Sequence, residues 1–207
     1  MSSSTPDDAW NKFYREYGQA MVAWQLVESE LATVFSMLTK IPPPMAIQIF
    51  YSARSFNGRI DIYKAGITAC TAPTEIKAMA RGLINKAKKY AEYRNKFAHD
   101  QPRLRQQGQP AKFDILMVDG KGQFQIDALK SEYLARAVTI AEITDAAACF
   151  RNLADLTRDV WAQHLSMRAA SLDKLRERLE ALPILPRSRD QSKRPGKPKG
   201  KRAPVRR

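Results

Sequence analysis

Apolar side chains recur at steps of three and four residues along much of this chain, and that spacing constrains its fold more than any other feature. The clearest stretch runs over residues 8–38, where the apolar positions are Trp10, Phe13, Tyr17, Ala20, Trp24, Val27, Leu31, Val34 and Leu38. Such steps place side chains on one face of an α-helix. Asp7 and Asp8 suit the N-terminus of this helix, and the prolines that follow Ile41 end it.

The same spacing predicts three further helices. The second starts within residues 43–46 and runs to about Cys70, and the third covers roughly residues 73–98. The fourth is long, because no glycine or proline occurs from Ala128 to Leu182, and we expect a kink in it near Ser166. Each long helix carries one apolar stripe, which is typical of helices packed side by side in a bundle.

The helical pattern stops between the third and fourth helices. Residues 100–112 have the composition of a polar loop, and residues 113–118 and 123–126 flank a turn at Asp119–Gly122. Asp-Gly supplies the positive φ that a tight hairpin turn needs. We therefore expect an all-α protein, an up-and-down four-helix bundle with a small β-hairpin inserted between its third and fourth helices.

Charge divides the chain into a mildly basic body and a strongly basic end. Of the formal net charge of +14, residues 186–207 hold +9, from six Arg and four Lys against one Asp. Four prolines and no aromatic residue leave this end too little apolar surface to offset the entropy of ordering. We expect residues 1–7 and 183–207 to be disordered and residues 8–182 to form one domain. The basic end would bind nucleic acid through phosphates, or act only as a solubilising tail.

Several protein classes are disfavoured by what the sequence lacks. It contains no GxxxxGK[ST], GxGxxG, HExxH or GxSxG motif, which argues against P-loop, Rossmann, zincin and hydrolase-elbow chemistry. We expect no metal and no cofactor. Two cysteines are too few for a disulfide scaffold, no apolar run is long enough for a membrane span, and the first ten residues do not form a signal peptide. These features predict a cytoplasmic protein without membrane contact.

One position breaks the apolar pattern of the third helix. On a helical wheel Arg94 falls at the centre of the apolar stripe, while Asn95 and His99 lie on its flank, one turn apart. A guanidinium keeps its charge, so at such a position it needs an anion or water. A buried ion pair with Glu28 or Asp61 is one explanation, and a phosphate-binding cleft is the other.

The segment from Arg94 to His99, R-N-K-F-A-H, resembles the R-x4-6-H signature of the HEPN superfamily, including the polar residue favoured directly after the arginine. HEPN domains are helical bundles with this motif near the end of one bundle helix, and the likeness in helix pattern covers roughly residues 8–165. The resemblance implies a metal-independent endoribonuclease, such as a toxin or an antiviral effector. Other HEPN domains are inactive and serve as dimerisation or RNA-binding modules.

The resemblance also implies a role for each residue of the motif. Arg94 would hold the scissile phosphate or its developing charge, His99 would act as general acid and base around the ribose 2′-hydroxyl, and Asn95 would orient it. In most HEPN proteins two copies place their motifs in one composite cleft, so a catalytic site at a dimer interface is expected. The alternative is a non-catalytic homodimer that binds RNA or a partner protein.

Three basic side chains near the motif are candidate RNA-binding residues, namely Lys96, Arg103 and Arg105, although a solvated surface is as plausible for them. The expected partners are RNA and a second copy of the chain, with an antitoxin or another protein as a further candidate. A homodimer is expected because one short bundle would leave the apolar flank around Phe97 and Ala98 partly uncovered.

Overall fold

The computed structural model describes residues 5–107, 112–119, 137–166 and 170–185. The described part is mainly helical, as expected, and also contains a three-stranded antiparallel sheet in the order β1-β2-β3. The elements are α1 (Pro6–Thr39), α2 (Pro43–Ser52), α3 (Phe56–Ala69), α4 (Thr74–His99), β1 (Asp100–Gln107), β2 (Lys112–Asp119), β3 (Val138–Thr139), α6 (Ile140–Ser166) and α7 (Ala170–Ala181).

Helix α1 begins earlier than the sequence predicted. The Thr5 hydroxyl accepts a hydrogen bond from the backbone N–H of Asp8 at 3.2 Å, and the Asp8 carboxylate accepts one from the Thr5 N–H at 2.9 Å. This reciprocal pair is a capping box, which satisfies two backbone donors at the helix start. The expectation of disorder over residues 1–7 is therefore wrong for residues 5–7, while residues 1–4 lie outside the described ranges.

The predicted second helix is two helices. Ser55 starts α3 by accepting a hydrogen bond from the Gly58 N–H at 3.1 Å. Its backbone is extended, as is that of Ala53 at the end of α2, so the helical path breaks between them. The prediction of one continuous helix up to Cys70 is wrong because the apolar spacing continues across a serine cap.

The observed hairpin joins residues 100–107 to residues 112–119, so its first strand precedes the predicted one. Strand β1 occupies residues 100–107, which were expected to be a loop, and pairs with β2 so that Leu104 lies opposite Ile115. The predicted strand at 113–118 lies within β2, whereas residues 120–122 and 123–126 lie outside the described ranges. β1 is the edge strand of the described sheet, and an edge tolerates the missing N–H of Pro102, which explains why its composition looked like that of a loop.

The long fourth helix also starts later than expected. Residues 138–139 form β3, which pairs with Leu116 and Met117 of β2, and α6 begins at Ile140. Thr139 caps α6, since its hydroxyl accepts from the Glu142 N–H at 3.2 Å and its own N–H donates to the Glu142 carboxylate at 2.8 Å. The kink expected near Ser166 coincides with the end of α6.

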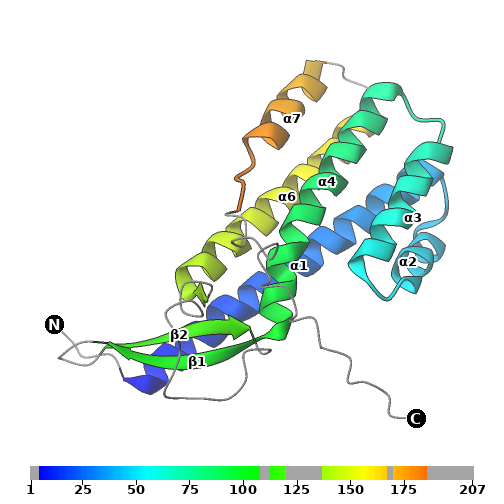
Figure 1. Ribbon diagram of the computed structural model, residues 1–207. Helices are drawn as coiled ribbons and strands as arrows, with labels where there is room; N and C mark the ends of the chain where they lie inside the picture. The colour runs from blue at the N-terminus through cyan, green and yellow to red at the C-terminus, as the bar shows by residue number, and fades with distance from the viewer. Residues whose placement is uncertain (1–4, 108–111, 120–136, 167–169, 186–207) are drawn as a thin grey trace, which may run out of the picture.

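Figure 1 shows α1, α4 and α6 running side by side as the main body, with α2 and α3 beside α1 and the sheet at the end where α4 finishes. Aromatic rings fill the space between the three long helices. Phe150 of α6 contacts Trp24 of α1, Tyr90 and Phe97 of α4, at centroid separations of 5.2, 5.9 and 6.5 Å. The packing places the last turn of α4 against a rigid core and directly before β1.

Helix α7 and the residues after it pack along α4. The Lys86 ammonium donates to the Leu182 carbonyl at 2.5 Å, and the Tyr90 hydroxyl donates to the Pro183 carbonyl at 2.7 Å. Leu182 and Leu185 are buried, so the folded body extends to residue 185. The expectation that the disordered end starts at residue 183 is therefore wrong for residues 183–185, and residues 186–207 lie outside the described ranges.

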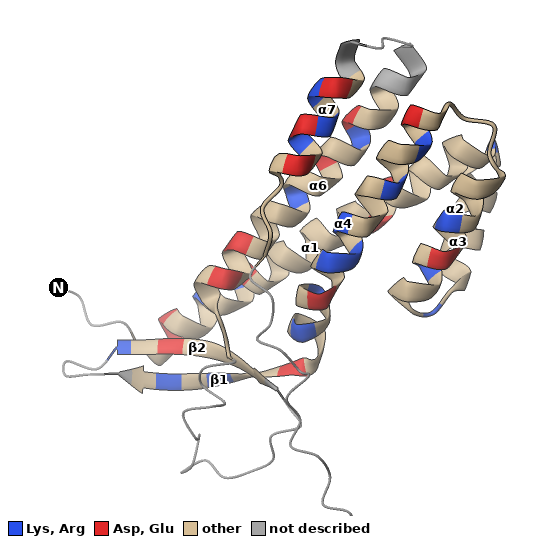
Figure 2. Cartoon of the chain, turned by 45° about the horizontal axis from the view of Figure 1, so that its top comes forward, with Lys and Arg blue, Asp and Glu red and all other residues tan. Residues whose placement is uncertain are grey.

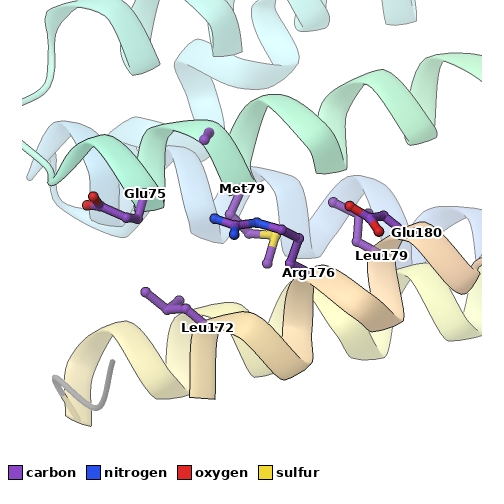
Figure 3. Close-up of a pocket in the computed structure, with 7 residues that line it drawn as sticks. Glu75, Met79, Leu172, Arg176, Leu179 and Glu180 are labelled. Carbon is purple, nitrogen blue, oxygen red and sulfur yellow. The ribbon is translucent and has the colours of Figure 1, made fainter. Parts of the chain in front are cut away.

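The contact between α7 and the rest of the bundle is incompletely filled. Between α4 and α7 lies a cavity of about 220 Å³, and Figure 3 shows the side chains that line it, among them Glu75, Met79 and Arg176. A second cavity of about 290 Å³ lies between α6 and α7, beside Leu156 and Leu182. Both hollows open to solvent, and they border α7 on two sides.

Candidate functional site

Arg94 lies in the last two turns of α4 and is half-buried. Its Nε atom is buried without a hydrogen-bond partner, and its Nη1 atom makes one long hydrogen bond, 3.4 Å, to the Asn95 side-chain oxygen. Arg94 forms no ion pair with any residue of the described ranges. Its guanidinium therefore retains donors that an added anion could accept from, and a neutral amide oxygen compensates little of its charge.

The two carboxylates considered as partners of Arg94 do not hold it. Glu28 pairs instead with Arg59, whose Nη1 atom lies 2.6 Å from the Glu28 carboxylate. The Arg59 guanidinium also lies over the Tyr51 ring, 4.6 Å from its centroid. Asp61 is exposed on α3 and is not paired with Arg94. An ion pair between Arg94 and Glu28 is therefore wrong as an explanation of the broken apolar pattern.

Asn95 and His99 are both exposed at the C-terminal end of α4, and His99 is its last residue. The final turn also holds Lys96, so two basic side chains face the negative end of the helix dipole. No hydrogen bond joins Arg94 to His99 in the described structure. The motif thus presents an exposed imidazole and a half-buried guanidinium on one helix end, without direct contact between them.

Lys96 rests on an aromatic neighbour. Its ammonium lies 5.6 Å from the centroid of the Tyr93 ring, within the range of a cation–π contact. Burial, together with the nearby carboxylate of Glu142, raises the pKa of Tyr93 to about 12. The Tyr93 hydroxyl is therefore neutral at physiological pH and adds no negative charge to the site.

The two arginines of β1 differ in their availability. Arg103 is exposed and donates to the Gln101 side-chain oxygen at 2.7 Å, a neutral partner. Arg105 is paired across the hairpin with Asp114 at 3.1 Å, so its charge is largely neutralised. Residues two apart share one face of a strand. Of these two candidate RNA-binding residues, Arg103 is the more available to a phosphate.

Basic side chains therefore gather where α4 passes into β1, and Figure 2 shows Lys and Arg along the end of α4 and on β1. Because β1 begins at the residue after His99, a strand rather than a loop fixes the position of Arg103 relative to the motif. Sequence reasoning found the residues of this surface but missed the strand that carries two of them. Alternation of Arg103 and Arg105 with other residues was the available signal.

Within the described ranges, no group of three or more His, Cys, Asp or Glu side chains is placed to hold a metal ion. None of the helices in those ranges combines the length and the apolar character that a membrane crossing requires. Comparisons with protein-family models, with curated proteins and with solved structures find no match to this chain.

Proposed function

We propose that this chain is a metal-independent endoribonuclease, a toxin or a defence effector, whose site consists of Arg94, Asn95 and His99. The observation that carries the proposal is the guanidinium of Arg94, which is half-buried, lacks an anionic partner among the described residues and has an Nε atom without any partner. An RNA phosphate would pair with the Nη donors of this guanidinium and compensate its charge. The resemblance of the segment Arg94–His99 to the HEPN signature supports the same reading.

The chemistry follows from the residue types present. The imidazole of His99 takes the proton from a ribose 2′-hydroxyl, whose oxygen attacks the adjacent phosphorus while the bond from phosphorus to the 5′-oxygen breaks. A proton returns to that 5′-oxygen, which leaves as a hydroxyl. Arg94 stabilises the charge that develops on the phosphoryl oxygens. The products carry a 2′,3′-cyclic phosphate, or the 3′-phosphate formed when water opens it, and a 5′-hydroxyl.

The test is cleavage of RNA by the full chain in the presence of EDTA, with the product ends identified by mass spectrometry. His99→Ala and Arg94→Ala should each lower the rate at least about a hundredfold, as expected for loss of an acid–base group or of a charge-stabilising donor. Arg81→Ala is the matched control, because Arg81 is exposed on the same helix far from the motif. Unchanged cleavage in both motif variants, or no cleavage by the parent chain, would overturn the proposal.

Unfolding of the same variants separates catalysis from structure. His99 is exposed and Arg94 has no ion pair in the described structure, so each alanine variant should unfold within about 1 kcal/mol of the parent. A loss of about 3–5 kcal/mol for Arg94→Ala would instead indicate a stranded carboxylate and a structural role.

A second candidate function is a non-catalytic homodimer that binds RNA or a partner protein. The observation that favours it is a large exposed apolar face on α1, described below. Of the flank on which a dimer is expected from the sequence, Phe97 is only 1% exposed and belongs to the core, whereas Ala98 is exposed. We therefore test the motif of a single copy first.

The resemblance implies that two motifs share one cleft. Mixing two inactive variants tests this. A mixture of inactive Arg94→Ala and inactive His99→Ala chains would regain activity if each cleft takes its residues from two copies. Separate sites in each copy would leave the mixture inactive.

A further inference from the structure

The outer face of α1 carries an apolar ridge that no described part of the chain covers. Tyr14, Val22 and Leu26 are 61%, 60% and 42% exposed, and with Gly18 they form a series at four-residue steps. Residues four apart lie next to each other on one side of a helix. The ridge therefore extends over about 18 Å of helix, at 1.5 Å per residue.

A hollow of about 370 Å³ runs beside the ridge, between α1 and α6. Its lining combines small and apolar residues with an arginine at either side: Gly18, Val22, Ala23, Leu26, Gln19, Arg15 and Arg151. A Cβ atom added to Gly18 would meet no atom within 4 Å. The glycine therefore leaves open space in the ridge, where a side chain from another molecule can enter.

The exposed face of α1 itself carries little charge, although Arg151 of α6 lines the hollow beside it. From position 14 to its end, α1 has eight exposed residues, and only Arg15 among them is charged. The eight are Tyr14, Arg15, Gln19, Val22, Gln25, Leu26, Ser29 and Thr33. Arg15 is itself paired with Glu16 at 3.1 Å. Charged residues make up 27% of the whole chain, so their scarcity here is unusual for a helix that faces water. Depletion of charge together with exposed aromatic and apolar residues is typical of the centre of a protein interface.

We propose that a second copy of this chain covers the ridge, with the two α1 helices crossing in opposite directions about a twofold axis near residue 20. In a twofold contact the same surface patch of each copy faces the other, so the patch must be complementary to its own copy. Here Val22 would enter the space above the partner's Gly18, and Tyr14 would lie against the partner's Leu26. The equal four-residue spacing lets every apolar residue of the ridge meet an apolar or small residue of the copy.

Charge favours a second copy over nucleic acid as the occupant. Residues 1–185 hold +5 and residues 186–207 hold +9 of the formal net charge of +14, so two copies repel each other, and a face of α1 with few charges is where they can approach. RNA would instead seek a basic surface, and the ridge offers its phosphates no row of cations.

This inference does not rest on the proposed function. The ridge lies on the face of α1 opposite the buried residues that pack toward α4, and Figure 1 shows α1 behind α4. Contact through the ridge therefore leaves the two α4 helices, with their Arg94 turns, on the outer sides of the pair. Mixed Arg94→Ala and His99→Ala chains should accordingly remain inactive, whereas loss of dimerisation should leave any cleavage activity in each copy.

The experiment is sedimentation equilibrium on the full chain at a concentration on the order of tens of micromolar. The parent chain should be a dimer, and Val22→Glu should weaken association about a hundredfold or more, because each dimer would have to remove water from two carboxylates in an apolar contact. Ile47→Glu is the matched control, since Ile47 is 47% exposed on α2, away from the ridge. It should leave the dimer intact, and circular dichroism should show that all three chains are equally folded.

Salt distinguishes the alternatives. Raising the salt concentration from about 0.1 to about 0.5 M should strengthen the dimer, because it screens repulsion between two basic chains without weakening apolar contact. A monomeric parent chain, a dimer that survives Val22→Glu, equal loss in the Ile47→Glu control, or association that weakens with salt and is abolished by digesting RNA would each overturn the proposal.

Discussion

At the scale of single residues, Glu28 shows how this bundle holds a charge in its interior. The Glu28 side chain is 10% exposed and that of its partner Arg59 is 18% exposed, and the two atoms in contact are 2.6 Å apart. An ion pair removed from water is stable mainly as long as both partners remain, because a single stranded charge is costly.

Arg59→Met should therefore lower the free energy of unfolding by about 3–5 kcal/mol, while the double variant Glu28→Met/Arg59→Met should recover most of that loss. Urea unfolding of the parent, both single variants and the double variant gives the coupling energy directly. If the double variant loses as much stability as the two single variants together, the ion pair contributes nothing beyond its two separate side chains.

Two glycines should respond in opposite ways to the same substitution. A Cβ on Gly66 would lie 2.7 Å from a ring carbon of Phe35, so Gly66→Ala should cost about 1–3 kcal/mol through overpacking. Gly18 lies in the interior of α1 with open space around it, so Gly18→Ala should stabilise the helix by up to about 1 kcal/mol. Both are best measured by urea unfolding in a Val22→Glu background, which removes any contribution from association. A gain in stability at Gly66 would contradict the packing between α3 and α1.

Buried tyrosines predict a loss of stability in alkali. Burial raises the pKa of Tyr93 to about 12, and burial also raises the pKa values of Tyr63 and Tyr90. In the unfolded chain a tyrosine titrates near pH 10, so the stabilisation is complete below that pH and is lost as the pH rises from about 10 to 12. Tyr93→Phe should reduce this loss, by up to about 1.4 kcal/mol per pH unit over that window. Urea unfolding at a series of pH values checks the slope, and an identical slope in the variant would refute the prediction for Tyr93.

At the scale of elements, the sequence predicted the helices better than the points where they end. Apolar spacing located α1, α4 and α6 because each buries one continuous stripe. It could not locate the break before α3, since Ser55 caps that helix without interrupting the apolar pattern. It also could not assign β1, because pairing with β2 depends on contacts between strands, whereas the composition around Pro102 is that of a loop.

Apolar spacing also made part of the candidate site predictable. The helical wheel placed Arg94 on the apolar face, and the structure has it half-buried. The identity of Arg59 as the partner of Glu28 depends on how α3 packs against α1, which no local pattern contains. The ridge on α1 does not stand out in the sequence, because the apolar spacing is dominated by the buried stripe, which includes Phe13 and Leu31, and the ridge lies on the opposite face.

Helix α7 should be the element that opens most readily. It borders two cavities, and its chain is tied to α4 through the hydrogen bonds of Lys86 and Tyr90 to the residues that follow it. Tyr90→Phe removes one of these bonds, worth about 1 kcal/mol, so amide exchange in α7 should accelerate roughly fivefold. Exchange in the middle of α1 should remain nearly unchanged under conditions where local opening dominates. Hydrogen exchange followed by mass spectrometry measures both, and equal acceleration in both helices would indicate global rather than local destabilisation.

At the scale of the whole molecule, charge and structure are separated along the chain. The described body ends at Leu185, whose side chain is buried, and the ten basic residues of the final segment follow it. Removing residues 186–207 takes away +9 of the formal net charge of +14 without removing any side chain of the described core.

The truncated chain should therefore unfold at nearly the same temperature as the parent but bind RNA more weakly, with a shallower dependence of log Kd on log salt concentration. Thermal unfolding and RNA titrations at several salt concentrations measure the two effects. An unchanged salt slope would show that the basic end does not contact RNA.

The contacts of α1 also affect how the protein folds during its synthesis. Glu16 bonds to Thr144 and Glu30 to Arg158, so each pair joins residues 128 positions apart. At synthesis rates of about 5–20 residues per second, the first helix waits on the order of ten seconds before its main partner helix leaves the ribosome. During that interval the side of α1 that packs against α6 is uncovered, and so is its outer ridge. The nascent chain therefore carries this long amphipathic helix without its main partner for most of its translation, and a ribosome-associated chaperone would be expected to bind α1 during that time.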